Sequence, residues 1–284
     1  MNIVYEDSLT LPGEFISVSK PAQVLKAVYN PAYDTVHGIE LLDQRDFYLA
    51  HSPYYVDRVF DLSMHNGFGS ANSEYLTQII AANSCLYTAV RYALLTKKPT
   101  AALCSGFHHA KYGSGGGFCT FNGLLIAILK IRATYGRLKN VLIIDGDGHY
   151  GDGTDDIIRE LDLRGIHNLT HRLDDKKFGL NPLGWQDTIS SSLKHSLVDW
   201  DLVIYQAGAD CHEADDFGAG YLTDLEWEER DKLVFSTCKE LGVPIVWNLA
   251  GGYSNEKTIE LHASTFSTAR QVYEPRHRQQ SPVL

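Results

Sequence analysis

Four residues that could do chemistry together lie in one short stretch of the chain, DGDGHYGD at 145–152. They are Asp145, Asp147, His149 and Asp152. Closely spaced carboxylates repel one another unless a cation neutralises them, and a bound metal ion is the usual solution. The alternative interpretation is a solvated acidic turn that caps a following helix. The stretch alone leaves both interpretations open.

Two other motifs nearly fit the same stretch. Gly146, Gly148 and Gly151 match the G-x-G-x-x-G pattern of dinucleotide-binding proteins, which would indicate an NAD-dependent oxidoreductase. That pattern works by aiming bare backbone N–H groups at a pyrophosphate, and the Asp147 carboxylate would repel this anion. A calcium EF-hand loop requires Gly at its sixth position, where this chain has Tyr150. We therefore favour neither motif.

A fourth acidic residue comes from a distant part of the chain. Asp210 ends an apolar run, LVIYQAGAD, that has the character of a buried strand. The carboxyl ends of parallel strands meet at one edge of a sheet, so Asp210 can lie beside Asp147 and His149. Two carboxylates and one imidazole leave an open position on a metal ion, which is typical of a catalytic site. Such a donor set accepts Zn²⁺, and also Fe²⁺ or Co²⁺.

Two histidines and a tyrosine follow two further apolar runs. His108 and His109 end one run, and Tyr253 follows Ala-Gly-Gly at the end of the other. Asp145 and Asp152 are available to orient the imidazoles and raise their basicity. The phenol of Tyr253 could swing toward a substrate carbonyl because small residues precede it. Alone, paired histidines are equally well ordinary core or surface residues, and such a tyrosine is a turn residue.

The elements that must position these side chains alternate along the chain. Short apolar runs predict buried strands, and the segments between them have helical spacing with polar faces. This alternation predicts a three-layer α/β/α fold, one domain over 1–284, with a mainly parallel sheet and a site at the carboxyl ends of its strands. The predicted strands are 100–107, 140–147, 200–210 and 244–253, and the predicted helices are 121–136, 153–165 and 222–242.

The two ends of the chain are less regular. Residues 1–50 contain one short predicted strand, NIVY, within loop-like sequence. From about 266 the chain becomes polar and has no clear period, which predicts a frayed tail.

Composition excludes several classes of function. The 25 basic and 35 acidic residues give a net charge of −10, which disfavours a nucleic-acid partner. The five cysteines contain no C-x-x-C pair, so we expect neither a disulfide framework nor a cysteine-rich zinc module. With no signal-peptide pattern and no apolar run of membrane-spanning length, we expect a soluble, cytoplasmic protein without membrane contact. The oligomeric state is not predicted.

Five separated motifs, in order, resemble the histone deacetylase-like amidohydrolases, which share the arginase/deacetylase α/β fold. The resemblance is dense over 100–254. The motifs are FHHA (107–110), GFCTFN (117–122), DGDGHYGDGT (145–154), GADCHEADDFG (208–218) and AGGY (250–253).

The resemblance implies that Asp147, His149 and Asp210 bind one divalent ion, most often zinc. It implies that His108 and His109 lie beside the metal-bound water. Asp145 would orient His108, and by the same resemblance Asp152 would orient His109. A monovalent cation, K⁺, would lie near the backbone around Asp145, Asp147 and His149.

The resemblance also assigns the substrate site. Tyr253 would polarise the amide carbonyl, while Gly117 and Phe118 would line the tunnel for the acylated amine, with Phe178 as a candidate for its second wall. The implied reaction hydrolyses the N-acetyl amide of a lysine-like amine to acetate and free amine, and His109 takes the proton of the water. Phe217 stands where polyamine-specific relatives carry a gatekeeping Glu, which favours a monoamine.

Two alternatives stay open. One is an amidohydrolase of acetylpolyamines or other small amides, whose cationic substrates the acidic charge would attract. The other is a catalytically idle relative that binds acylated ligands. An arginase-like dimanganese site is disfavoured because too few further carboxylates stand at motif spacing.

Overall fold

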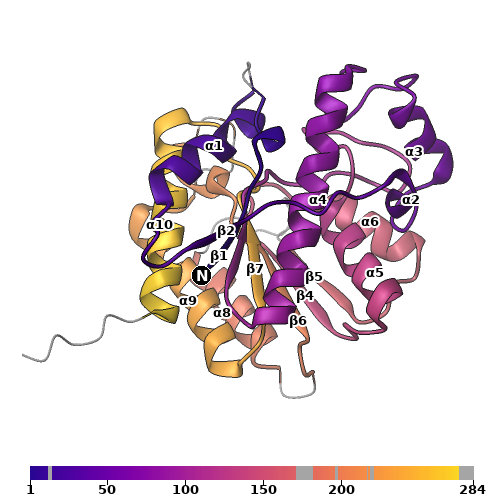
Figure 1. Ribbon diagram of the computed structural model, residues 1–284. Helices are drawn as coiled ribbons and strands as arrows, with labels where there is room; N and C mark the ends of the chain where they lie inside the picture. Colours follow the sequence, from indigo (N-terminus) through magenta and orange to yellow (C-terminus); the bar gives the residue numbers. More distant parts are fainter. Residues whose placement is uncertain (12–14, 171–181, 196–197, 216, 218–220, 275–284) are drawn as a thin grey trace, which may run out of the picture.

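Seven strands form one sheet in the order β2-β1-β3-β7-β6-β4-β5, and every neighbouring pair is parallel (Figure 1). The computed structural model describes residues 1–11, 15–170, 182–195, 198–215, 217 and 221–274. The strands are β1 (Asn2–Val4), β2 (Thr35–His37), β3 (Thr100–Ala102), β4 (Val141–Asp145), β5 (Ile166–Thr170), β6 (Leu202–Gln206) and β7 (Ile245–Asn248).

The central strands are buried on both faces, which explains their continuous apolar sequence. In β4, Val141 and Ile143 pack into the core on one face of the sheet, and Leu142 and Ile144 pack into the core on the other. Successive side chains of a strand point to opposite faces, so one unbroken apolar run supplies both cores. Because the central strands are buried on both faces of the sheet, helices must cover both faces.

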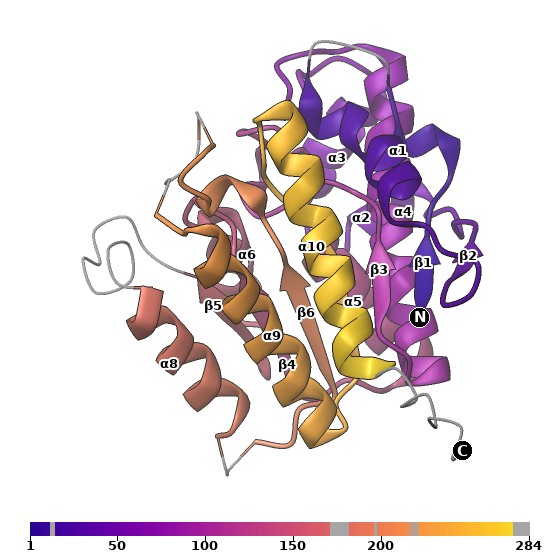
Figure 2. The same ribbon diagram turned by 90° about the vertical axis from the view of Figure 1, so that its left-hand side faces the viewer.

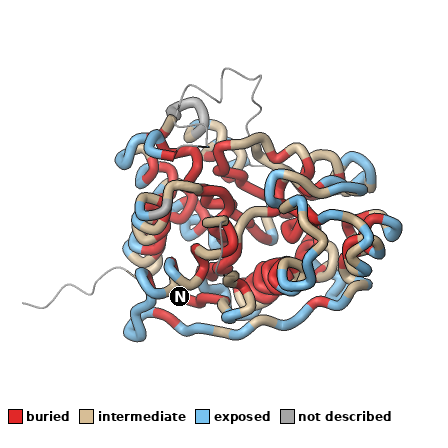
Figure 3. Tube along the Cα trace, turned by 90° about the horizontal axis from the view of Figure 1, so that it is seen from above, coloured by how far each residue is buried: buried red, intermediate tan, exposed pale blue. Residues whose placement is uncertain are grey.

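Helices cover both faces of the sheet (Figures 1 and 2). One layer contains α1 (Ile16–Val28), α8 (Pro182–Leu193), α9 (Asp224–Leu241) and α10 (Asn255–Tyr273). The other contains α2 (Gln44–Phe47), α3 (Pro53–Phe60), α4 (Ser73–Thr96), α5 (Gly123–Tyr135) and α6 (Asp152–Glu160). Two 3₁₀ turns, η1 (Asp7–Leu9) and η2 (Ala209–Cys211), complete the described elements. Seen from above, buried residues concentrate between the layers (Figure 3). The predicted three-layer α/β/α class with a parallel sheet is confirmed.

The predicted helices lie where local signals placed them. At the start of α9, Thr223 and Glu226 form a capping box, and Gly242 ends the helix in the left-handed conformation. Asn122 caps α5 by accepting the N–H of Leu125.

Three expectations need correction. Each long predicted strand stops early, β3 at Ala102 for example, because the following residues bend into loops at the carboxyl edge. Residues 1–50 contain a full helix, α1. The chain also remains helical past 266, to Tyr273, because Phe266 and Ala269 are buried in the core of that face.

Candidate metal and catalytic site

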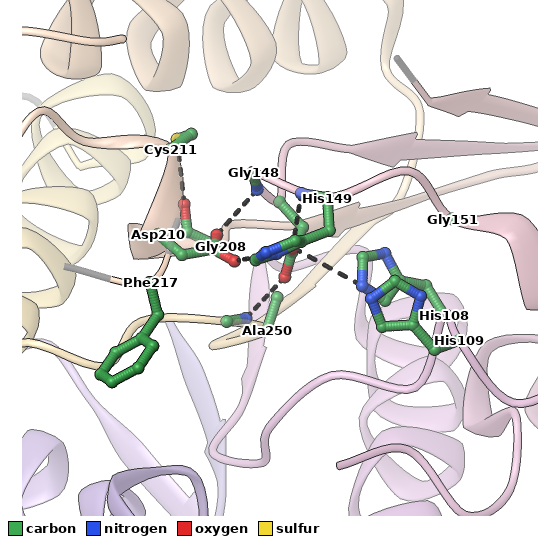
Figure 4. A network of polar contacts seen from close by, with 12 residues as sticks. His108, His109, Gly148, His149, Gly151, Gly208, Asp210, Cys211, Phe217 and Ala250 are labelled. Atoms are coloured by element: carbon green, nitrogen blue, oxygen red, sulfur yellow. Dashed lines mark hydrogen bonds and ion pairs between the residues drawn. The ribbon is translucent and has the colours of Figure 1, made fainter. Parts of the chain in front are cut away.

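The loops that follow β3, β4, β6 and β7 converge at the carboxyl edge of the sheet (Figure 4). They carry His108 and His109, the DGDGH stretch, Asp210 and Tyr253, respectively. A narrow cavity of about 20 Å³ is lined by His108, Phe118, Asp147 and Tyr253, among others. Residues from the loops after β3, β4 and β7 therefore face one space.

Asp147, His149 and Asp210 form the one group among the described residues whose geometry suits a metal ion. Their donor atoms all lie within 4.8 Å of one another. His149 Nδ1 is 2.9 Å from Asp210 Oδ2 and 3.2 Å from Asp147 Oδ1. The second oxygen of each carboxylate is fixed by backbone: Gly251 N donates to Asp147 Oδ2 at 2.7 Å, and Gly148 N donates to Asp210 Oδ1 at 2.8 Å.

The charges of these three residues call for a cation between them. Asp147 and Asp210 are both buried, and burial together with the charge of Asp147 raises the pKa of Asp210 to about 7. Hydrogen bonds to the two carboxylates raise the pKa of His149 to about 10, so these carboxylates favour a positive charge beside them. A divalent ion would supply that charge directly, and the two-carboxylate, one-imidazole donor set fits such an ion.

Each of the two histidines pairs with its predicted carboxylate. His108 Nδ1 is 2.8 Å from Asp145 Oδ2, and His109 Nδ1 is 2.8 Å from Asp152 Oδ1. Burial disfavours the charged form of His108, but Asp145 and the neighbouring Asp147 outweigh it and raise the pKa of His108 to about 9. Burial and the charge of His108 lower the pKa of His109 below its ordinary value. The pKa values of the two neighbouring imidazoles are therefore shifted in opposite directions.

Gly117 and Phe118 lie against these groups. Gly117 has φ +54°, and a Cβ there would come within 2.6 Å of His109 Cδ2, so only glycine suits the position. Phe118 follows with φ +61°, a rare conformation for a bulky residue. Its ring centroid is 5.9 Å from that of Tyr253. Phe217 is 73% exposed, and its ring lies 5.9 Å from Tyr253 on an edge-on approach. Phe178 lies outside the described residues.

Sequence reasoning missed three buried polar residues that support the site. Gln206 Nε2 donates to Asp145 Oδ1 at 3.0 Å. Asp215 Oδ2 accepts the backbone N–H groups of Tyr253 and Ser254, at 2.7 and 3.2 Å. Lys20 is fully buried in α1, and its Nζ donates to the carbonyl of Ala250 at 2.5 Å.

The signals for these residues were weak. Asp215 stands in the acidic GADCHEADD stretch, so an acidic residue near the site could have been suspected. Nothing in the sequence around Lys20 indicates that α1 reaches the loop before Tyr253. Burial lowers the pKa of Lys20 to about 8.

Comparison with known proteins identifies the family. The family described as the histone deacetylase domain matches residues 19–178 and 184–269, which is most of the chain. The chain belongs to the histone deacetylase family.

Individual relatives are more distant. An uncharacterized protein of Picosynechococcus is 33% identical over 184 residues, covering 59% of this chain and 61% of that protein. Histone deacetylase 2 of Arabidopsis thaliana is 28% identical over 193 residues, covering 58% of this chain and 47% of that protein. The matched segments therefore cover about half to three fifths of the length of these curated relatives.

Solved structures share the fold. An acetylpolyamine aminohydrolase from Burkholderia pseudomallei has a TM-score of 0.77 at 16% identity, covering 96% of this chain and 99% of that one. The HD domain of HDA15 has a TM-score of 0.75 at 18% identity, covering 96% and 90%. No helix in the described part of this chain is both long and apolar enough to span a bilayer.

Proposed function

We propose that this protein is a metal-dependent deacetylase that hydrolyses the N-acetyl amide of a lysine-like amine to acetate and a free amine. One observation carries the proposal. In a chain that belongs to the histone deacetylase family, three candidate metal donors lie within 4.8 Å of one another and two histidines pair with carboxylates, while His108, Asp147 and Tyr253 line one narrow cavity. Deacetylation of an amine is the chemistry that this combination supports best.

In this proposal, Asp147, His149 and Asp210 hold one divalent ion. Zn²⁺ is the leading choice, and Fe²⁺ or Co²⁺ also suit the donors. When bound, such an ion polarises the amide carbonyl and makes water acidic enough to attack near neutral pH. The proposal includes a K⁺ ion near the backbone around Asp145, Asp147 and His149.

The protein's own groups then handle protons and charge. His109 is the general base: its pKa is lowered, so the ring is neutral, and Asp152 holds Nδ1 so that Nε2 is the nitrogen that accepts a proton. A histidine returns a proton to the leaving amine. Tyr253 donates its O–H to the oxygen of the former carbonyl as negative charge develops there; burial raises the pKa of Tyr253, which keeps that proton on the phenol.

The substrate proposal rests on the residues around the entrance. Gly117 and Phe118 would line the path of the amine chain. The exposed ring of Phe217 offers no carboxylate to a second ammonium group, which favours acetyl-lysine or another acetylated monoamine. The fold of an acetylpolyamine aminohydrolase is shared, so an acetylated polyamine or another small amide is the second candidate.

The test measures metal content and acetate release together, on acetyl-lysine peptides and N-acetylpolyamines. We expect about one divalent ion per chain in wild type, loss of metal and activity in Asp210→Ala, and loss of activity with metal retained in Tyr253→Phe. If wild type binds metal but cleaves no acylated amine, the idle, ligand-binding interpretation replaces the deacetylase. Faster cleavage of polyamines than of peptides would refute the monoamine preference.

A further inference from the structure

A buried guanidinium lies directly behind the metal donors. Arg230, on α9, is 1% exposed and belongs to none of the motifs singled out in the sequence. Its Nη1 donates to the carbonyls of Gly146 at 3.1 Å and Gly208 at 3.4 Å, and to Cys211 Sγ at 3.0 Å. Gly146 immediately precedes Asp147, and Asp210 lies between Gly208 and Cys211. One nitrogen therefore bonds to both loops that carry the metal-binding carboxylates.

The guanidinium is itself rigidly held. Asp231 Oδ1 accepts from Arg230 Nε at 3.1 Å and from Nη2 at 3.0 Å, a two-point contact. The same carboxylate accepts the hydroxyls of Tyr205 and Thr265, each at 2.5 Å, so β6, α9 and α10 all fix it. The guanidinium carbon lies 3.9 Å from the centroid of the Trp227 ring.

We propose that Arg230 is a positioning residue that holds the two carboxylate-bearing loops at the separation that the metal ion requires. The inference rests on the metal site proposed above. Arg230 and Asp231 are both buried and form an ion pair, so together they add no net charge beneath the site. The effect therefore comes from geometry. Ligand positions must be held to within about 0.5 Å for productive metal binding, and a rigid donor shared by two loops provides that constraint.

Arg230 adds a second link between the two loops, beside the direct bond from Gly148 N to Asp210 Oδ1. Asp147 and Asp210 belong to different strand-to-helix connections, and their carboxylates repel each other when both are ionised. The sheet aligns β4 with β6 up to the pairing of Asp145 with Gln206. Beyond that pair the loops leave the sheet, although Gly146 N still donates to the Gln206 carbonyl at 2.9 Å. The bonds from Arg230 extend this alignment to the ligand-bearing residues.

The test compares Arg230→Lys and Arg230→Met with wild type. The lysine keeps the charge and the aliphatic stem but cannot reach Asp231 and both loops at once. The readouts are the dissociation constant for Zn²⁺ and the visible absorption spectrum of the Co²⁺-loaded protein, which reports coordination geometry. We expect both variants to bind Zn²⁺ about 10- to 100-fold more weakly and the Co²⁺ bands to shift.

Arg270→Met is the matched control. Arg270 also bonds to a backbone carbonyl, that of Val28, and to a buried carboxylate, that of Asp34, but it contacts neither metal-bearing loop. We expect it to lower the melting temperature without changing the Zn²⁺ constant or the Co²⁺ spectrum.

Each outcome decides the proposal. Binding of Zn²⁺ by Arg230→Lys within twofold of wild type, with an unchanged Co²⁺ spectrum, overturns it, and so does an equal weakening in Arg270→Met. Failure of both Arg230 variants to fold also overturns it, because the residue would then serve the whole fold. If wild type binds no divalent ion, the proposed metal site itself fails, which separates that failure from failure of Arg230 alone.

Discussion

Gly251 offers a sharp test of the site because it packs against both carboxylates of the proposed metal site. A Cβ added there would lie 2.3 Å from Asp210 Oδ2 and 2.7 Å from Asp147 Oδ2. Ordinary van der Waals contact begins near 3.4 Å, so Gly251→Ala forces a displacement of about 1 Å. The backbone cannot retreat freely, since Gly251 N donates to Asp147 and Gly251 O accepts from Ala209 N at 3.0 Å.

The displacement sets the size of the expected effect. A misplacement of 1 Å at a reacting centre costs on the order of 100-fold in rate. We therefore expect Gly251→Ala to lower kcat/KM for acetate release by about 100-fold and to weaken metal binding. Gly251 does not have a left-handed φ, so the substitution adds no strain of that kind to the backbone, and the fold should persist.

The assay follows acetate release under kcat/KM conditions on the best substrate of the wild type, alongside the Zn²⁺ dissociation constant. Gly113→Ala is the matched control, because a Cβ at that position meets no atom within 4 Å. If Gly251→Ala retains kcat/KM within threefold of Gly113→Ala, the two carboxylates do not act at the positions described here, and the reasoning fails.

Three further predictions concern the base, its pH dependence and the core. Asp152→Asn removes the carboxylate that holds His109 Nδ1. We expect kcat to fall by about 100-fold, at the low end of what general-base catalysis contributes, and Zn²⁺ affinity to stay unchanged. Loss of the metal instead would contradict the assignment of Asp152 to His109. Burial and the charge of His108 lower the pKa of His109 below 6.5, so its ring is neutral at pH 7. We expect kcat/KM to decline only as the pH falls below about 6.5. An acid limb of the pH profile centred above that value would refute the assignment of His109 as the base. Phe266→Ala should reduce the free energy of unfolding by about 3 to 5 kcal/mol, because the Phe266 ring is fully buried against Trp247. Unfolding in urea measures this change. A loss under about 1 kcal/mol would argue against that packing.

The core of the site was predictable from sequence because strand ends in a parallel sheet share one edge. Asp147 and His149 follow β4, Asp210 follows β6, and the pairing of those two strands brings them together as expected. The β–α alternation was equally visible, since buried parallel strands and amphipathic helices have different apolar periods.

The supporting polar residues were not predictable, for a physical reason. Lys20 and Arg230 lie in helices whose sequences suggest solvent-facing charge, yet both are buried because partners from distant parts of the chain satisfy them. Sequence periodicity records the average environment of a helix face, and an isolated buried charge looks like an exposed one. A related effect hid the end of α10, where Thr268 is buried within the mostly polar sequence STARQ.

The position of β7 has a consequence for how the molecule is assembled. In the sheet, β7 lies between β3 and β6, so it joins the half that precedes His108 to the half that carries the metal donors. Yet β7 is the last of the described strands to be synthesised. During translation the two halves have no common strand until residue 248 has left the ribosome. If the proposed metal ion needs the Gly251 backbone to fix Asp147, it binds only after residue 251 has been synthesised.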